Sequence, residues 1–368
     1  MITTLQLCNF RNHENIKFDL SRHNVIVFCG ENGVGKTNVL EAISMFSGSS
    51  GIHGAKNEDI IRQGSESDFW HINVEIDNTK FVLGYLKSKG KRVYKVNGKQ
   101  VRNSLDFLRE NYILWLTYAT DRLFVESPAN RREFIDMLCS AVYKEHSANL
   151  SLYEKLARER IRILKKYCES GIRHDIANWL DVIEPQIADL GIKVSENRIN
   201  IAKLLEANKV NDNSFPEFVN NIYGIVEQRL SNLSAEEKKT YYKEELKSRR
   251  VKDGYAGKTT FSPNSSDWIV RFKNKNMFAY NCSAGEQKIL LCGIFLSFVI
   301  YKVQNDKRHL IILLDDVIAH LDENYREILF SYINRFAKSN GHMVTIFLTG
   351  IDREQFKPLG DDVLFFGL

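Results

Sequence analysis

Cysteine and proline are scarce in this chain, with six cysteines and five prolines among 368 residues. The cysteines form no C-x-x-C pair and show no Cys/His zinc spacing. This excludes a disulfide-stapled scaffold and a zinc module, and it favours a reducing, cytoplasmic compartment. The small number of prolines also excludes a proline-rich linker. The cysteines are Cys8, Cys29, Cys139, Cys168, Cys282 and Cys292.

Long apolar runs are also lacking. The longest nearly apolar run, residues 289–300, is too short to span a membrane. Residues 1–13 have neither the basic start nor the apolar stretch of a signal peptide. A hydrophobic content of 43% excludes a disordered or fibrous chain, and a net charge of +5 permits a nucleic-acid partner without demanding one. We therefore expect a soluble cytoplasmic protein that needs no membrane.

The order of predicted elements divides the chain into three segments. Residues 1–125 alternate as strands do, with turns at 88–90 and at Asn97-Gly98. From Ser127, a potential cap followed by proline, the pattern becomes helical and charge-rich. After residue 283 it reads helix, strand, helix, strand. We predict an α/β head formed by residues 1–125 and 253–368 and interrupted by an all-helical arm of residues 126–252.

The strongest motif is GENGVGKT at residues 30–37, a complete G-x-x-x-x-G-K-T pattern between an apolar strand and a helix. Glycines let backbone N–H groups surround phosphate oxygens, and the helix N-terminus adds a favourable dipole. Lys36 would reach the β- and γ-phosphates as a catalytic residue, and Thr37 would ligate Mg²⁺. The alternative is a glycine-rich turn with an incidental lysine. The predicted nucleotide-binding residues here are Gly30, Glu31, Asn32, Gly33, Val34, Gly35, Lys36 and Thr37.

A pair of carboxylates supplies the acidic partner of this loop. The apolar run 310–314 ends in Asp315 and Asp316. Adjacent carboxylates at the end of an apolar strand are costly unless they are solvated or bind a metal. We predict that Asp315 binds Mg²⁺ and that Asp316 is catalytic, because it would orient or polarise the attacking water. The alternative is an acidic turn at the end of a strand.

The third motif is SAGEQ at residues 283–287, which precedes the apolar helix. Ser283 and Glu286 fit a capping box, so one interpretation is a well-capped helix. Together with the other two motifs, the segment resembles the signature of ABC-type ATPases. That resemblance implies an ATP-bridged homodimer, in which Ser283, Gly285 and Gln287 meet nucleotide held by the other subunit and Ser283 takes part in catalysis. Residues 319–322 resemble the D-loop at that interface.

A closer resemblance covers the chain from residue 5 to about residue 350. LQLCNFRN at 5–12, SPANRREFID at 127–136 and LDDV at 314–317 accompany the two glycine-containing motifs. In this order they are similar to the RecF family of bacterial recombinational-repair ATPases in the SMC/ABC superfamily. The resemblance implies an ABC-type P-loop head with ATP and Mg²⁺ as cofactors and weak, DNA-dependent ATPase activity. It also implies binding to duplex DNA and single-strand/duplex junctions, recombinase loading in replication and SOS-linked repair, and RecR as partner. By analogy Arg11 contacts nucleotide, the alternative being a surface arginine.

Three departures from the family pattern predict slow hydrolysis. Residues 262–267 read SPNSSD, where the family typically has Gly-Pro-His-Arg-Asp-Asp. No glutamine lies between Gln100 and Gln186, so a Q-loop glutamine cannot be assigned. The strand ending at Leu348 is followed by Thr349 and not by a switch histidine. A clamp that binds ATP but scarcely hydrolyses it is one rival, and a transporter-type ABC subunit is another.

A basic segment is the candidate DNA site. Between Asp77 and Asp106 there are eight basic residues and no acidic one. Phosphate contacts from such a segment would be independent of DNA sequence. The alternative is an edge hairpin whose lysines prevent aggregation. The predicted DNA residues are Lys87, Lys89, Lys91, Arg92 and Lys95.

Overall fold

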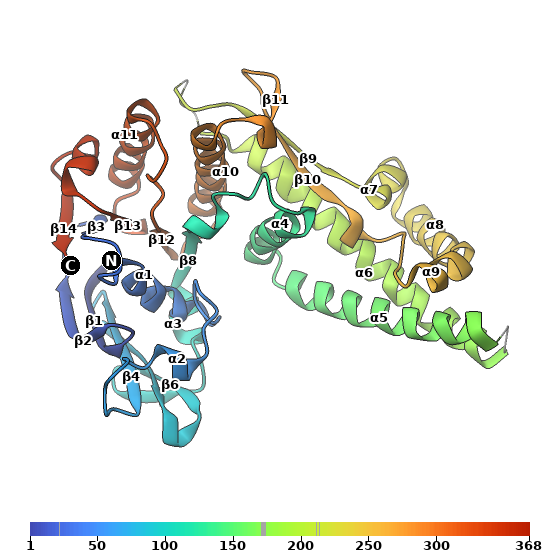
Figure 1. Ribbon diagram of the computed structural model, residues 1–368, viewed down its shortest axis with the longest axis horizontal. Coiled ribbons are helices and arrows are strands. Elements are labelled where there is room, and N and C mark those ends of the chain that lie inside the picture. The colour runs from blue at the N-terminus through green and yellow to red at the C-terminus, as the bar shows by residue number, and fades with distance from the viewer. Residues whose placement is uncertain (22, 171–173, 211, 213) are drawn as a thin grey trace. The chain divides into compact units, whose positions relative to one another are not determined.

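The chain divides into two compact units, which we call the head and the arm (Figure 1). A computed structural model describes residues 1–21, 23–170, 174–210, 212 and 214–368. The head comprises Met1–Asp121, Val210–Phe215 and Ser283–Leu368, and the arm comprises Arg122–Lys209 and Pro216–Cys282. The chain therefore leaves the head after Asp121 and returns to it at Ser283.

A five-stranded parallel sheet lies in the head. In spatial order its strands are β14 Val363–Gly367, β3 Val25–Cys29, β13 Val344–Gly350, β12 His309–Leu314 and β8 Asn111–Leu116. Every residue of β3, β12 and β13 is buried. Burial on both faces explains why these strands read as continuous apolar runs rather than alternating ones. Because β13 lies between β3 and β12, the carboxyl ends of all three strands meet at one edge.

A second, antiparallel sheet has six strands. In spatial order these are β2 His13–Asp19, β1 Ile2–Phe10, β4 Phe69–Ile76, β5 Thr79–Leu86, β6 Lys91–Val96 and β7 Lys99–Val101. Burial alternates along β4 and β5, so one face of the sheet is covered and the other is exposed. The turns at Asp77-Asn78 and Asn97-Gly98 have positive φ at both residues, as type I′ hairpin turns require.

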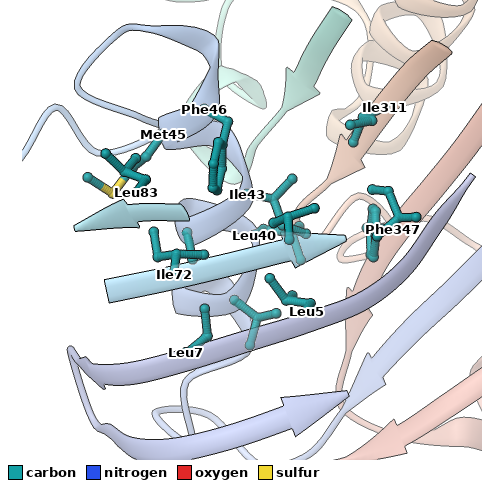
Figure 2. Close-up of a cluster of buried hydrophobic side chains, with 14 of the residues drawn as sticks. Leu5, Leu7, Leu40, Ile43, Met45, Phe46, Ile72, Leu83, Ile311 and Phe347 are labelled. Carbon is teal, nitrogen blue, oxygen red and sulfur yellow. The ribbon is translucent and has the colours of Figure 1, made fainter. Parts of the chain in front are cut away.

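Both sheets of the head share one hydrophobic core (Figure 2). Helix α1, Lys36–Ser44, contributes Leu40 and Ile43 to it. Ile72 comes from the antiparallel sheet and Phe347 from the parallel sheet, and all four side chains are essentially inaccessible to solvent. The phosphate loop joins β3 to α1, so packing at both of its ends fixes the conformation of the loop.

The other head helices are α2 Asn57–Ile60, α3 Leu105–Glu110, α10 Ala284–Asn305 and α11 Glu323–Asn340. Helix α10 begins with the capping box predicted from the sequence, in which Ser283 and Glu286 bond reciprocally. Within the described residues it is the one helix long and apolar enough to cross a membrane. Its most apolar window is 72% buried, which is typical of a core helix.

The arm contains helices and one small sheet. Its helices are α4 Pro128–Val142, α5 His146–Ser170, α6 His174–Ala207, α7 Ile225–Leu230, α8 Ala235–Ser248 and α9 Arg250–Ala256. Its antiparallel strands are β9 Phe218–Tyr223, β10 Asp267–Phe272 and β11 Met277–Phe278. The fully buried Arg160 on α5 bonds to Glu184 on α6 and to Asp253 on α9, which joins three helices through paired charges.

This arm differs from the all-helical insert of residues 126–252 that the sequence predicts. It extends to Cys282 and includes the sheet β11-β10-β9. Strand β10 follows residue 253, yet it pairs along its length with β9, and its Trp268 stacks on Phe134 of α4. The short strand β9 was missed because two consecutive asparagines interrupt its apolar residues. Without β9 as a pairing partner, nothing in the local sequence assigns β10 to the arm.

Candidate functional site

The connection between β3 and α1 has the geometry of an anion-binding loop. Gly30, Gly33 and Gly35 have positive φ, which residues with a side chain rarely adopt. A Cβ on Gly35 would lie 2.4 Å from Asn12 Oδ1, so this position also needs glycine for space. Gly35 caps α1 without a side-chain hydrogen bond to the first turn. The amide N–H groups of that turn therefore remain available to a phosphate.

The turn between β1 and β2 supports this loop. Asn12 Nδ2 donates to the carbonyl of Val34 at 2.7 Å, and Asn12 Oδ1 accepts from Asn38 Nδ2 at 2.8 Å. His13 Nε2 lies 3.2 Å from the carbonyl of Gly35. Burial lowers the pKa of His13, so its ring is neutral at neutral pH and donates this bond as N–H. The sequence assigned neither residue a role, although Asn12 belongs to the N-terminal family motif.

Lys36 lies across the phosphate loop. Its Nζ donates to the carbonyl oxygens of Gly30 at 2.6 Å and of Glu31 at 2.8 Å. These bonds hold the ammonium group over the loop from which the backbone N–H groups project. The lysine therefore adds a full positive charge to the partial positive charge of the helix N-terminus.

Thr37 and Asp315 meet at the carboxyl edge of the parallel sheet. Thr37 Oγ1 donates to Asp315 Oδ1 at 2.9 Å, and Thr349 Oγ1 donates to the same oxygen at 2.8 Å. The hydroxyl of Thr349 also accepts from the backbone N–H of Asp316 at 2.8 Å. Thr349, at the end of β13, thus bridges both aspartates. This role is not predictable from the sequence, because only the order of strands in the sheet places Thr349 between β3 and β12.

Asp316 has a strained backbone and a perturbed carboxyl group. Its φ is +54°, in the left-handed region that is costly for a residue with a side chain. Burial raises the pKa of Asp316, as does the neighbouring charge of Asp315, and the ammonium group of Lys288 opposes both. A conformation of this kind persists where surrounding contacts determine it, which is common at functional sites.

A hollow of about 180 Å³ lies between the phosphate loop and the aspartate pair. Of the predicted nucleotide-binding residues, Gly30, Glu31, Val34, Arg11 and the signature residues are not among those that line it. A hydroxyl and a carboxylate oxygen in contact are the hard oxygen donors that Mg²⁺ prefers, so Thr37 and Asp315 fit that metal. The hollow is lined by Asn32, Gly33, Gly35, Lys36, Thr37, Asn38, Asp315, Asp316 and Thr349.

The signature segment presents its serine at the start of α10. Ser283 is exposed, whereas Gln287 is buried with 7% of its surface accessible. A Cβ on Gly285 would lie 3.2 Å from the carbonyl of His320, so this glycine permits close approach of the D-loop-like segment. Ser283 accepts from the N–H of Glu286, as a helix cap does. Its exposure leaves the helix N-terminus accessible to a ligand from outside this chain.

Arg11 is held in an ion pair. Its Nε and Nη2 donate to the two carboxylate oxygens of Glu41 at 2.8 and 2.6 Å, and its Nη1 donates to the carbonyl of Asp59 at 3.0 Å. Glu41 is fully buried, so this bidentate pair compensates a charge that would otherwise be costly. In this conformation Arg11 joins the turn after β1 to α1 and α2, and contact with nucleotide would require it to leave Glu41.

The Arg131-Arg132 motif lies within the arm. Arg131 forms a bidentate pair with Asp267 at 2.7 and 2.8 Å, and Arg132 donates to the carbonyl of Ser266. Asp136, which ends the same motif, forms a bidentate pair with Arg198 of α6. This part of the family pattern therefore ties α4 to β10 and α6. It also gives Asp267, in the altered 262–267 loop, a structural partner.

The basic segment divides between the two faces of its sheet. Lys91 and Lys95 share the exposed face of β6, whereas Arg92 points to the covered face. Arg92 there donates to Asn57 Oδ1 and to the carbonyl of Ser49, both at 2.7 Å. The structure therefore separates Arg92 from the predicted group of phosphate-binding residues. Alternation along a strand is the physical reason.

The exposed face of this sheet carries a hollow of about 560 Å³. Lys80, Lys89 and Lys95 are among its lining residues, and no carboxylate is among them. The rings of Phe69 and His71 are stacked on β4 at its side, with centroids 6.0 Å apart. Lys80 was part of the acid-free segment but not of the predicted DNA set. Lys87, which was part of that set, is exposed outside the hollow.

Comparison with known proteins gives consistent matches over the whole chain. The family model described as the RecF/RecN/SMC N terminal domain matches residues 1–358. "DNA replication and repair protein RecF" of Mesorhizobium japonicum is 34% identical, over 97% of this chain and 93% of that protein. The protein of the same name from Agrobacterium fabrum is also 34% identical, over 100% of this chain and 96% of its own length.

Solved structures agree on the fold. The structure described as the recombination mediator protein RecF-ATPrS in the RecFOR pathway aligns with a TM-score of 0.76 at 22% identity. The alignment covers 100% of this chain and 96% of that one. A RecF-ATP structure of the same pathway aligns with a TM-score of 0.71 at 20% identity. The ABC-type ATPase head with an inserted arm, expected from the motifs, is therefore confirmed as the fold.

Proposed function

This chain belongs to the RecF family, and we propose that it is an ATP-dependent DNA replication and repair protein. The observation that carries the proposal is the set of contacts around Asp315, which receives hydrogen bonds from both Thr37 and Thr349. These contacts join the phosphate loop to Asp315 at the end of β12, and all three residues line the same hollow. Similarity to RecF proteins over the full length of the chain supports the same function.

ATP is the proposed ligand of this hollow. Backbone N–H groups of the 30–37 loop and the ammonium group of Lys36 would hold the β- and γ-phosphates. Thr37 and Asp315 would hold Mg²⁺, which when bound would neutralise charge on the phosphates. Asp316 would orient the attacking water. The absence of a switch histidine at the end of β13 supports slow turnover, because Thr349 at that position contacts the aspartates without a titratable side chain.

The exposed N-terminus of α10 supports an ATP-dependent homodimer. Ser283 and Gly285 lie at the start of this helix, outside the lining of their own chain's hollow. A helix N-terminus is a favourable site for an anion, and nucleotide held by a second copy would supply one. ATP would then stabilise the dimer by mass action, since it binds the assembled form better than the separate chains.

DNA is the proposed macromolecular partner, in the cytoplasm and without a membrane. Lys80, Lys89 and Lys95 around the hollow on the antiparallel sheet provide positive charge for phosphates. We extend the proposal to DNA gaps and single-strand/duplex junctions, where the dimer would assist recombinase loading in SOS-linked repair. RecR is the proposed protein partner. These finer assignments rest on the family resemblance.

The test of the function is sedimentation of the protein with ATP, ADP or no nucleotide, alone and with gapped, duplex and single-stranded DNA. We expect ATP to convert a monomer into a dimer that binds DNA, and we expect Lys36→Ala to remain monomeric. A monomer under every condition would contradict the proposal. A transporter-type subunit would instead associate with vesicles and not with DNA.

One rival is a clamp that binds ATP without hydrolysing it appreciably. The partly buried and strained setting of Asp316 favours hydrolysis over this rival. Asp316→Asn separates the two, because loss of hydrolysis should prolong the lifetime of the ATP-bound dimer. An unchanged lifetime would favour the inert clamp.

A further inference from the structure

Lys288 is a buried cation on α10 that the nucleotide motifs do not explain. Only 2% of its surface is exposed. Its Nζ donates to Asp121 Oδ2 at 2.7 Å and to the backbone carbonyl of Asp316 at 2.8 Å. A buried ammonium group is costly unless its hydrogen bonds and its charge are both satisfied. The partners are 167 and 28 residues away in sequence, so the fold brings them together.

The ion pair lies where the chain passes between head and arm. Asp121 is the last residue of the head before the arm begins. The chain returns at Ser283, and α10 starts at the next residue. Lys288 lies just beyond the signature segment on that helix. Lys288 thus links Asp121, where the chain leaves the head, to α10, which begins where the chain re-enters the head.

The same lysine holds one side of Asp316. The N–H of Asp316 is bonded to Thr349, and its carbonyl is bonded to Lys288. A residue with φ of +54° needs such contacts, because its backbone would otherwise relax toward the right-handed region. Movement of this backbone would displace the Asp316 side chain from the hollow.

We propose that Lys288, anchored by Asp121, is a positioning residue that fixes Asp316 for ATP hydrolysis. The inference rests on the proposed function, in which Asp316 orients the attacking water. A purely structural ion pair is the alternative. It would stabilise the head without changing the rate of the chemical step in folded protein.

Lys302 provides a matched control. It is on the same helix with 6% of its surface exposed, and its Nζ donates to Asp306 at 2.7 Å, one turn further along the chain. Lys288→Met and Lys302→Met therefore each remove one buried ammonium group from α10 and one partner from a carboxylate, although Asp306 keeps its ion pair with Arg308. Neither Lys302 nor Asp306 lines the nucleotide hollow.

The experiment measures kcat and KM for ATP, together with nucleotide affinity and thermal unfolding, in the full-length chain. For Lys288→Met we expect kcat to fall about 10- to 100-fold, as for a misplaced catalytic group, while affinity for ATP changes less than about threefold. Lys302→Met should keep kcat within about twofold while also lowering stability. Lys288→Arg, which keeps the charge and donors, should recover part of kcat.

The outcomes separate this inference from the proposed function. Wild-type protein that neither binds nor hydrolyses ATP would overturn the proposed function itself. Wild-type turnover with an unchanged kcat in Lys288→Met, or an equal loss in Lys302→Met, would overturn the positioning role alone. Should Lys288→Met fail to fold, Asp121→Asn preserves shape and removes the anchoring charge. An unchanged kcat in that variant would count equally against the inference.

Discussion

A single hydroxyl group, that of Thr349, links the two halves of the nucleotide site. It donates to Asp315 and accepts from the backbone of Asp316, so it fixes both aspartates with one side chain. Thr37 contacts the same carboxylate oxygen from the phosphate loop. The proposed metal-binding and catalytic aspartates are therefore coupled through hydrogen bonds that a hydrophobic residue of the same shape could not make.

Thr349→Val should impair hydrolysis more than nucleotide binding. Loss of a hydrogen bond to a charged group costs about 1.5–3 kcal/mol, or about 10- to 100-fold if it acts on the transition state. We expect kcat and the apparent affinity for Mg²⁺ to fall, with ATP affinity less affected. Steady-state kinetics over a Mg²⁺ titration measures both quantities.

Thr345→Val is the matched control for this change. Thr345 lies on the same strand, is fully buried and bonds to His309 at 2.9 Å. Loss of this hydrogen bond should lower the stability of the protein without changing how kcat depends on Mg²⁺ concentration. Equal kinetic effects of the two variants would show that Thr349 acts only through the stability of β13.

At the scale of an element, the β5–β6 hairpin separates its basic residues by face. Lys95 pairs with Val82 and faces out, whereas Arg92 pairs with Tyr85 and faces the core. Charge density along the sequence thus overstates the charge on the exposed surface. The contacts of Arg92 with the 49–57 region give it a structural role.

Replacing Lys80, Lys89 and Lys95 together by alanine should weaken DNA binding and flatten its salt dependence. Each lysine that meets a phosphate contributes about one unit to the slope of log K against log salt. Binding measured from low to moderate salt gives this slope. Arg92→Ala should instead lower thermal stability while leaving the slope unchanged.

A triple variant with the same loss of charge serves as control. Lys239, Lys273 and Lys357 are exposed, and each is already paired with a carboxylate. Replacing them by alanine should leave the salt slope within experimental error. A comparable decrease in slope for both triple variants would mean that net charge, and not this sheet face, determines binding.

For the whole molecule, the head and the arm have separate hydrophobic cores. Ile72 belongs to the head core and Ile187 to the arm core, and each has no exposed surface. The arm core is reinforced by the buried charges of Arg160, Glu184 and Asp253. Nucleotide contacts are confined to the head in the proposed function, so ligand stabilisation should be confined there as well.

Calorimetry of core variants tests this separation. Ile72→Ala and Ile187→Ala should each cost about 2–5 kcal/mol, because both leave a cavity in a packed core. Ile72→Ala should lower the midpoint temperature of head unfolding, and Ile187→Ala that of arm unfolding. We expect ATP to raise the midpoint temperature of head unfolding only. A single transition that responds identically to both variants and to ATP would contradict two independent units.

The sequence alone determined the motifs whose meaning depends on local spacing. The 30–37 loop, the capping box of α10 and the apolar strands before residues 30 and 315 follow from backbone preferences and short-range periodicity, and the structure places them as predicted. The inserted arm was also evident, but its sheet was not, because β10 acquires its identity only by pairing with β9.

Tertiary structure decided which residues complete the site. Thr37 and Asp315 are 278 residues apart, and Lys288 and Asp121 are 167 apart, so neither contact has a local signature. Strand order places Thr349 between the other two strand ends. Local sequence specifies conformation through steric and periodic preferences. Contacts over such separations depend instead on how strands are ordered and which faces are buried, and only the folded chain fixes these.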